Sequence, residues 1–218
     1  MNKEVAASVK AALYWLDAWE IKTLDYFLRV LNAWVYDLWN SEIEKDEFID
    51  RLADLIQQQL TRAWNEGMRA NGLEMSDMTD EWQNELNDII ANEYSFVDKF
   101  AADIVAGRGG SVESFRVRAA LWANRYTDVV NRAKVMTAGK GVKMEWVYNP
   151  NKEHCETCPA LNGIVAFASE WDELGVRPQS PPNDLLSCGG WGCGCSLKPT
   201  DRRRTPKAYT VIMNIVNK

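Results

Sequence analysis

All five cysteines of this 218-residue chain lie after residue 154, in two groups with short internal spacing. Cys155 and Cys158 form a C-x-x-C, and thirty residues further on the chain reaches Cys188, Cys193 and Cys195. Thiolates at such spacings can converge on one tetrahedral ion, with each sulfur about 2.3 Å from a zinc centre. Four glycines lie among the last three cysteines, and glycine permits the tight turns of a backbone that folds around an ion. The pattern therefore predicts a structural zinc site.

Five sulfurs exceed the four ligands of a tetrahedral zinc site. All five cysteines are candidate ligands, and Cys155, Cys158 and Cys188 with one of Cys193 and Cys195 would make a four-cysteine site. Spacing alone does not say which of the five is spare. Disulfides and a redox-active C-x-x-C are the competing interpretations. However, an odd number of cysteines in one segment is unlike a secreted disulfide framework, and the βαβ context of a redox motif is missing from the sequence.

The chain has a single histidine, which limits the catalytic chemistry that its sequence predicts. A Ser/His/Asp or Cys/His enzyme would have to use His154, and no nucleophile elbow accompanies it. A lone histidine beside a cysteine, such as His154, is more often a solvated residue or a hydrogen-bond donor to a ligand than a metal ligand itself. Catalytic zinc sites keep an open position for water, whereas sites rich in thiolates are typically closed and structural. We therefore predict no enzymatic activity and no catalytic residues.

Residues 1–140, ahead of the cysteines, have the apolar spacing of amphipathic helices. Helices are expected over 4–39 (one helix or two), from Ser41 to Asn71, from Thr79 to Gly107 and from Ser111 to Gly139. Ser41 and Glu44 have the spacing of a capping box at the start of the second of these segments. The apolar arc of residues 13–38 is wide, as in a helix buried in a core or one that forms an assembly surface.

The pattern changes after Gly141. Residues 142–148 alternate between apolar and polar side chains and predict a short strand, and Asn162-Gly163 predicts a hairpin turn. Residues 209–216 fit either a last strand or a helical turn. We therefore predict an α+β protein: a helical domain over 1–140, then a small irregular zinc-stabilised β module over 141–218. A module of this size buries little apolar surface, so a metal would supply part of its folding energy.

The formal net charge of −6 is unevenly distributed along the chain. Residues 1–110 hold 21 acidic and 10 basic side chains, whereas residues 111–218 hold 10 acidic and 15 basic ones. Arg202, Arg203 and Arg204 form a basic tail with Lys198 and Lys207 beside them. Such a run is either a solvated turn or a site that neutralises phosphates. The sequence contains no long uncharged apolar stretch and no signal-peptide pattern, so we expect no membrane partner.

The C-terminal motif resembles that of a known family. The residues of this motif are Trp146, His154-Cys155-x-x-Cys158, Leu161-Asn162-Gly163, Trp171, Pro178, Leu186-x-Cys188-Gly-Gly and Cys193-x-Cys195. In this order and spacing they resemble the C-terminal part of phage head morphogenesis proteins, the minor head proteins of the Mu F-like family. The stretch Arg118–Gly139 is similar to the helix that leads into that part, and the resemblance covers about residues 115–200. Many members have a histidine where this chain has Pro181-Pro182-Asn183-Asp184, so Cys188 is expected to take the ligand role.

The resemblance implies a structural role in the virion. Minor head proteins associate with the portal or the capsid interior, assist procapsid assembly and influence DNA packaging or ejection. The expected partners are therefore the phage portal or major capsid protein, together with phage DNA through the basic C-terminal half. The expected location is the phage head, after assembly in the host cytoplasm. The alternative is a zinc module that binds nucleic acid and has no role in the virion.

Overall fold

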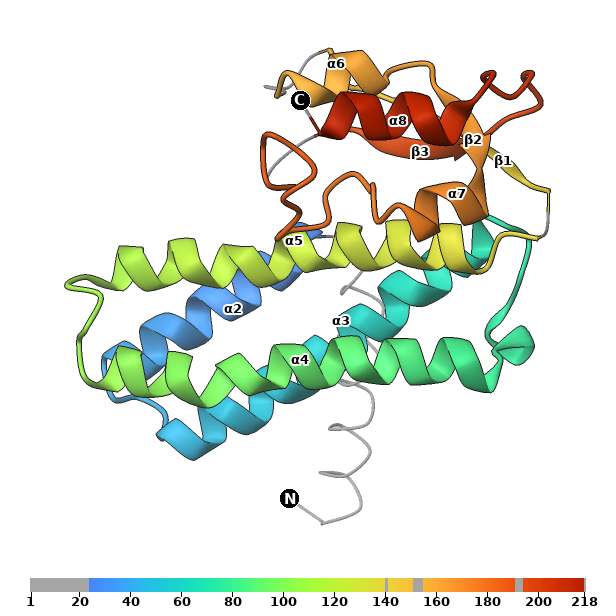
Figure 1. Ribbon diagram of the computed structural model, residues 1–218. Coiled ribbons are helices and arrows are strands. Elements are labelled where there is room, and N and C mark those ends of the chain that lie inside the picture. Colours follow the sequence, from blue (N-terminus) through green and yellow to red (C-terminus); the bar gives the residue numbers. More distant parts are fainter. Residues whose placement is uncertain (1–23, 140, 151–154, 191–193, 218) are drawn as a thin grey trace. The chain divides into compact units, whose positions relative to one another are not determined.

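The computed structural model describes residues 24–139, 141–150, 155–190 and 194–217 (Figure 1). The helical elements are α2 (Leu24–Trp39), α3 (Lys45–Arg69), the 3₁₀ turn η1 (Met75–Asp77), α4 (Asp80–Val105), α5 (Val112–Met136), α6 (Thr157–Leu161), α7 (Ala168–Glu173) and α8 (Ala208–Val216). The strands are β1 (Lys143–Val147), β2 (Val165–Phe167) and β3 (Ser196–Pro199). Long helices followed by a small sheet confirm the predicted α+β class. The part of the first predicted helix over residues 4–23 lies outside the described residues.

The chain divides into two compact units, and each of the helices α3, α4 and α5 contributes residues to both. In the described residues, the first unit comprises 24–53 and 97–123. The apolar face of α2 lies in its core, with Leu31 and Val35 fully buried. Phe100 is surrounded by other rings, at 4.9 Å from Trp122 and 6.1 Å from Phe115 between ring centroids. The described part of the wide apolar arc therefore belongs to the core of this unit.

The second unit comprises residues 54–96 and 124–217 in the described parts. Within it, α3 and α5 approach each other closely at Gly67, because a Cβ there would lie 2.5 Å from the Cβ of Ala133. The α3 end is held to α5 as well, since Asn71 donates hydrogen bonds to the carbonyl of Lys134 at 2.8 Å and to Thr137 at 2.9 Å. The domain boundary predicted after residue 140 stays a prediction. Residues 141–217 lie in the same compact unit as residues 54–96 and 124–139, which precede that boundary.

The C-terminal module contains a three-stranded antiparallel sheet with the strand order β2-β1-β3 (Figure 1). The alternation predicted for β1 is confirmed, because Met144 and Trp146 are buried on one face. Trp171 of α7 packs against Trp146 at 5.8 Å between ring centroids and donates a hydrogen bond to the Met144 carbonyl at 3.1 Å. Helix α8 adds Ala208 and Ile212 to the same core. Residues 209–216, for which the sequence allowed either a strand or a helical turn, are therefore helical.

Two local predictions are wrong. Ser41 does not start a helix: it ends α2 with a left-handed φ of 58° and donates its backbone N–H to Leu38, and α3 begins at Lys45. The Asn162-Gly163 turn is present, with a φ of 80° at the glycine, but it joins α6 to β2 instead of two strands. The residues before it form a helical turn, because the Asn162 N–H reaches back to the Cys158 carbonyl at 3.1 Å. Neither outcome is visible in dipeptide patterns alone.

Other helix termini are as predicted. Trp82 donates its backbone N–H to the Thr79 hydroxyl at 3.3 Å at the start of α4, and Ser114 does so to Ser111 at 3.4 Å at the start of α5. These bonds satisfy backbone donors that a helix cannot satisfy internally. In the part of the chain that the structure describes, no helix is long and apolar enough to cross a membrane.

Candidate metal centre

Three cysteines from two separate segments meet on one side of the C-terminal module. Cys155 precedes α6, Cys158 lies within it, and Cys188 lies in the loop between α7 and β3. Their sulfur atoms all lie within 4.8 Å of one another, and those of Cys155 and Cys158 are 3.3 Å apart. Sulfurs bound to one tetrahedral zinc ion are separated by about 3.8 Å, as follows from zinc–sulfur bonds of about 2.3 Å. The three side chains are therefore close enough to hold one metal ion.

The cluster lies at the boundary between the module's core and its surface. Cys158 is fully buried among apolar side chains, while Cys155 and Cys188 are partly buried and pack against the same core. An ion placed there would be shielded by apolar side chains on one side. The cluster can therefore exclude much of the solvent from a bound metal, as in the closed structural sites typical of thiolate ligands.

The other two predicted ligands differ in their position. Cys195 is buried in the module core immediately before β3, and its sulfur is not a member of the three-sulfur group. Cys193 lies outside the described residues, and so does His154. The structure describes Cys155, Cys158, Cys188 and Cys195 as thiols that are not joined in disulfides. Three of the five predicted cysteines are thus brought together.

The loop that carries Cys188 is ordered by backbone hydrogen bonds and by two glycines. Gly189 donates to the Leu186 carbonyl at 2.7 Å, and Asn183 donates to the Gly189 carbonyl at 2.9 Å. Gly190 has a φ of 81°, and a Cβ there would lie 2.8 Å from the backbone of Ser180. Because the three atoms nearest this Cβ position are all backbone atoms of Ser180 and Pro181, only glycine fits. The glycines predicted to permit tight turns are needed here.

Two hydroxyl groups hold the cysteine segments together, and sequence reasoning missed both. The Thr157 and Ser187 side-chain oxygens are 2.6 Å apart. The Ser187 N–H donates to the Thr157 hydroxyl at 3.1 Å, and the Thr157 N–H donates to the Ser187 hydroxyl at 3.3 Å. These residues directly precede Cys158 and Cys188. Their reciprocal bonds, which we call the hydroxyl clasp, fix the two segments in register beside the sulfurs.

The surroundings also favour the thiolate form of Cys155. Burial by itself would raise the pKa of this thiol, but hydrogen bonds from Ser187, Cys158 and Cys188 outweigh it and lower the pKa to about 6. A thiolate is the form of cysteine that binds a metal. The site is thus prepared electrostatically for a cation.

Removing the clasp is expected to weaken metal binding more than it weakens folding. Ser187→Ala deletes two hydrogen bonds of the clasp and the one from Ser187 to Cys155, but the residue is exposed, so we expect a loss of only about 0.5–1.5 kcal/mol in folding stability. Because outer-shell partners orient ligands, we expect metal affinity to fall by about 10-fold or more. Competition with a chromophoric chelator measures this affinity. Ser169→Ala, at an exposed serine of the same module, is the control. Equal affinities of the two variants would show that the clasp does not position the sulfurs.

A polar network fastens α7 and the loop that follows it to α4 and α5 within the second unit. Arg132 bridges Glu85 and Asp172 with nitrogen–oxygen distances of 2.8 and 2.9 Å. Arg125 contacts Glu93 at 2.8 Å and donates to the Pro181 carbonyl at the same distance. Glu93 is buried, and its pairing with Arg125 is therefore important for this unit. Sequence patterns gave no signal for these contacts, since their partners lie far apart in the chain.

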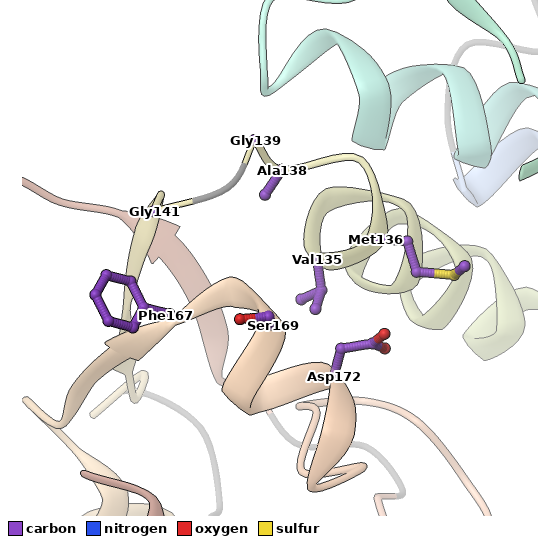
Figure 2. Close-up of a pocket in the computed structure, with 8 residues that line it drawn as sticks. All are labelled: Val135, Met136, Ala138, Gly139, Gly141, Phe167, Ser169 and Asp172. Carbon is purple, nitrogen blue, oxygen red and sulfur yellow. The ribbon is translucent and has the colours of Figure 1, made fainter. Parts of the chain in front are cut away.

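A pocket of about 320 Å³ lies at the end of α5, beside β2 and α7 (Figure 2). It is lined by Val135, Met136, Ala138, Gly139, Gly141, Phe167, Ser169 and Asp172. The carboxylate of Asp172 is already paired with Arg132 and, at 3.4 Å, with Arg177. None of the described cysteines lines this pocket, so the candidate metal centre is a separate place.

Comparisons with known proteins leave the motif and the geometry as the basis for function. No protein-family model matches the chain, no curated protein matches it, and no solved structure matches it.

Proposed function

We propose that this chain is a minor head protein of a tailed phage, a structural component that acts in procapsid assembly at the portal or capsid interior. The proposal is supported by the motif resemblance over about residues 115–200. Those residues include most of α5 and most of the cysteine-bearing module. In this role the chain has no enzymatic activity, and its module is a rigid part that other head components contact.

The observation that carries the metal part of the proposal is the approach of three sulfurs to within 4.8 Å of one another. Zinc is the ion that best fits a set of thiolates in a small module, because it accepts four sulfurs in a closed tetrahedron. The fourth ligand comes from Cys193 or Cys195. The zinc has a structural role: it joins the α6 segment to the Cys188 loop and supplies folding energy that the small core lacks.

The proposed partners are the phage portal protein, the major capsid protein or both, and phage DNA inside the head. The proposed location is the virion, reached by assembly in the host cytoplasm. A role of this kind does not require a catalytic cleft. It requires a stable fold with surfaces for neighbours, which a metal-stabilised module provides.

Co-purification with head structures tests this function. Procapsids and mature heads from infected cells are separated by density and probed for the full-length chain, and zinc in the purified chain is measured by elemental analysis. We expect the chain in head fractions at a fixed ratio to the portal, with about one zinc per chain. A variant with Cys155, Cys158 and Cys188 changed to Ala is the control, and we expect its zinc and its head association to be lost together. Absence of the unmodified chain from procapsids and heads would contradict the proposal and favour the nucleic-acid-binding alternative.

A further inference from the structure

One face of the module's sheet carries the basic side chains Lys143 and Lys198, beside Glu145 and the buried Val165. Antiparallel partners lie on the same face, so Lys143 shares a face with Phe167, and Glu145 shares it with Lys198. Met144 and Trp146 point to the opposite face, which is buried in the core. We call the first of these two faces, together with the segment 200–207 that follows β3, the basic face. It belongs entirely to the second unit.

The segment after β3 crosses from one side of this sheet to the other. Thr200 donates its N–H to the Lys143 carbonyl of β1 at 3.0 Å, and Thr205 donates its N–H to the Val165 carbonyl of β2 at 2.9 Å. The Lys143 ammonium donates to the carbonyls of Asp201 and Arg202, at 3.0 and 2.7 Å. The crossing is therefore fixed by hydrogen bonds, and the three arginines it carries have defined positions.

Two of these arginines each neutralise one acidic group beside the sheet. Arg202 pairs with Glu145 of β1. Arg204 pairs with Glu170 of α7 and stacks over the Phe167 ring, with its guanidinium carbon 5.4 Å from the ring centroid. These pairs are structural, since they hold the segment against the sheet.

Three further basic side chains have no such role. Lys198, Arg203 and Lys207 are exposed, and none of them is in an ion pair with another described residue. Asp201 is the single acidic side chain between residues 196 and 217, against five basic ones. Once Glu145 and Glu170 are neutralised, the basic face keeps a surplus of positive charge in a chain whose net charge is −6. Acidic residues more than about 10 Å away are largely screened at 0.1 M salt.

The composition of this face favours a nucleic-acid backbone over a protein. Protein interfaces usually have an apolar core with aromatic anchors. Among the described residues of 141–217, Tyr209 is the one large hydrophobic side chain that is exposed. Flexible cations without an apolar patch are instead what phosphates require, because backbone contacts are electrostatic and independent of sequence. We propose that the basic face, through Lys198, Arg203 and Lys207, binds the phosphate backbone of duplex DNA without sequence preference.

This inference rests on the proposed function only for the biological source of the DNA, which would be the genome inside the head. Head association and DNA binding are measured separately, so either can fail alone. Three phosphate contacts predict a slope of about −2.7 in log affinity against log salt, and hence a roughly 40-fold loss of affinity from about 50 to 200 mM salt.

Fluorescence anisotropy with the full-length chain and a labelled duplex of random sequence tests the proposal. The variant combines Lys198→Gln, Arg203→Gln and Lys207→Asn, the last because asparagine tolerates the left-handed φ of 52° at that position. We expect at least about 10-fold weaker binding and a much flatter salt slope. The control combines Lys45→Gln, Arg69→Gln and Arg116→Gln, which removes the same charge from exposed ion pairs elsewhere and should leave affinity within about 3-fold.

The proposal is overturned if the unmodified chain does not bind DNA at low salt, or if the basic-face variant binds as tightly as the unmodified chain. Equal losses in variant and control would also overturn it, because net charge alone would then explain binding. Tighter binding of labelled poly-glutamate than of DNA would assign the face to an acidic protein.

Discussion

Replacing Cys188 with alanine is expected to abolish zinc binding and to lower the thermal midpoint of the second unit by about 10 °C. Zinc held at about a thousand times its dissociation constant stabilises the folded state by about 4 kcal/mol. For a chain of this length, one kcal/mol corresponds to about 2–4 °C in the midpoint. Cys188 is the sole member of the three-sulfur group that comes from the loop between α7 and β3. Its loss therefore removes the metal link between that loop and the α6 segment and leaves too few ligands for a tight site.

The measurement pairs elemental analysis with calorimetry, in the presence and absence of a zinc chelator. Chelator treatment of the unmodified chain is expected to reproduce the lower midpoint of Cys188→Ala, and to leave the midpoint of that variant unchanged. Ser169→Ala, at an exposed position of the same module, is the control and should retain its zinc. Cys195→Ala is measured beside it, because this cysteine lies outside the three-sulfur group but is a candidate for the fourth ligand, and loss of its zinc would assign that ligand to Cys195. Retention of one zinc by Cys188→Ala would contradict the proposed site.

Local patterns predicted the elements whose causes are local. The start of α4 follows from a threonine whose hydroxyl accepts a backbone N–H, and β1 follows from alternation that places Met144 and Trp146 on one side. These features depend on neighbours within a few residues. The grouping of Cys155 and Cys158 is of the same kind, because two residues between cysteines set the distance of their sulfurs.

Features that depend on distant segments could not be predicted in this way. The hydroxyl clasp joins Thr157 and Ser187 across thirty residues, and both stand at positions that a cysteine motif leaves unspecified. The prediction of a capping box at Ser41 was wrong because this residue follows the end of α2 in a left-handed conformation, with its N–H bonded to the Leu38 carbonyl. The ion pairs of the basic tail were not predictable from its sequence: Arg202 pairs with Glu145 and Arg204 with Glu170, whereas Arg203 is in no ion pair with another described residue. Tertiary partners decided each case.

Gly67 is the sharpest example of a residue whose role is set by a distant segment. It lies inside α3, where glycine costs about 1 kcal/mol relative to alanine, so helix propensity alone predicts that Gly67→Ala stabilises the chain. The structure predicts the opposite. A Cβ at this position would lie 2.5 Å from the Cβ of Ala133 and 2.6 Å from the Val130 carbonyl oxygen. The second neighbour is backbone, so no side-chain rotation can relieve the contact.

We therefore expect Gly67→Ala to destabilise the second unit by about 1–3 kcal/mol, the usual cost of overpacking, in spite of its better helix propensity. Chemical denaturation followed by tryptophan fluorescence measures this change, because Trp64 lies one turn away in the same buried face. Gln58→Ala, at an exposed position of α3, is the control and should shift stability by less than about 0.5 kcal/mol.

A double-mutant cycle with Ala133→Gly separates steric contact from other effects of the substitution. Removing the Cβ of Ala133 relieves the contact at 2.5 Å but leaves the contact with the Val130 carbonyl at 2.6 Å. The double variant should consequently recover part of the stability that Gly67→Ala loses, after the cost of Ala133→Gly alone is subtracted. Full additivity would mean that α3 and α5 do not meet at these residues. A more stable Gly67→Ala would mean that the helices can separate at no cost, and the close approach of α3 and α5 would then not be needed to hold this unit together.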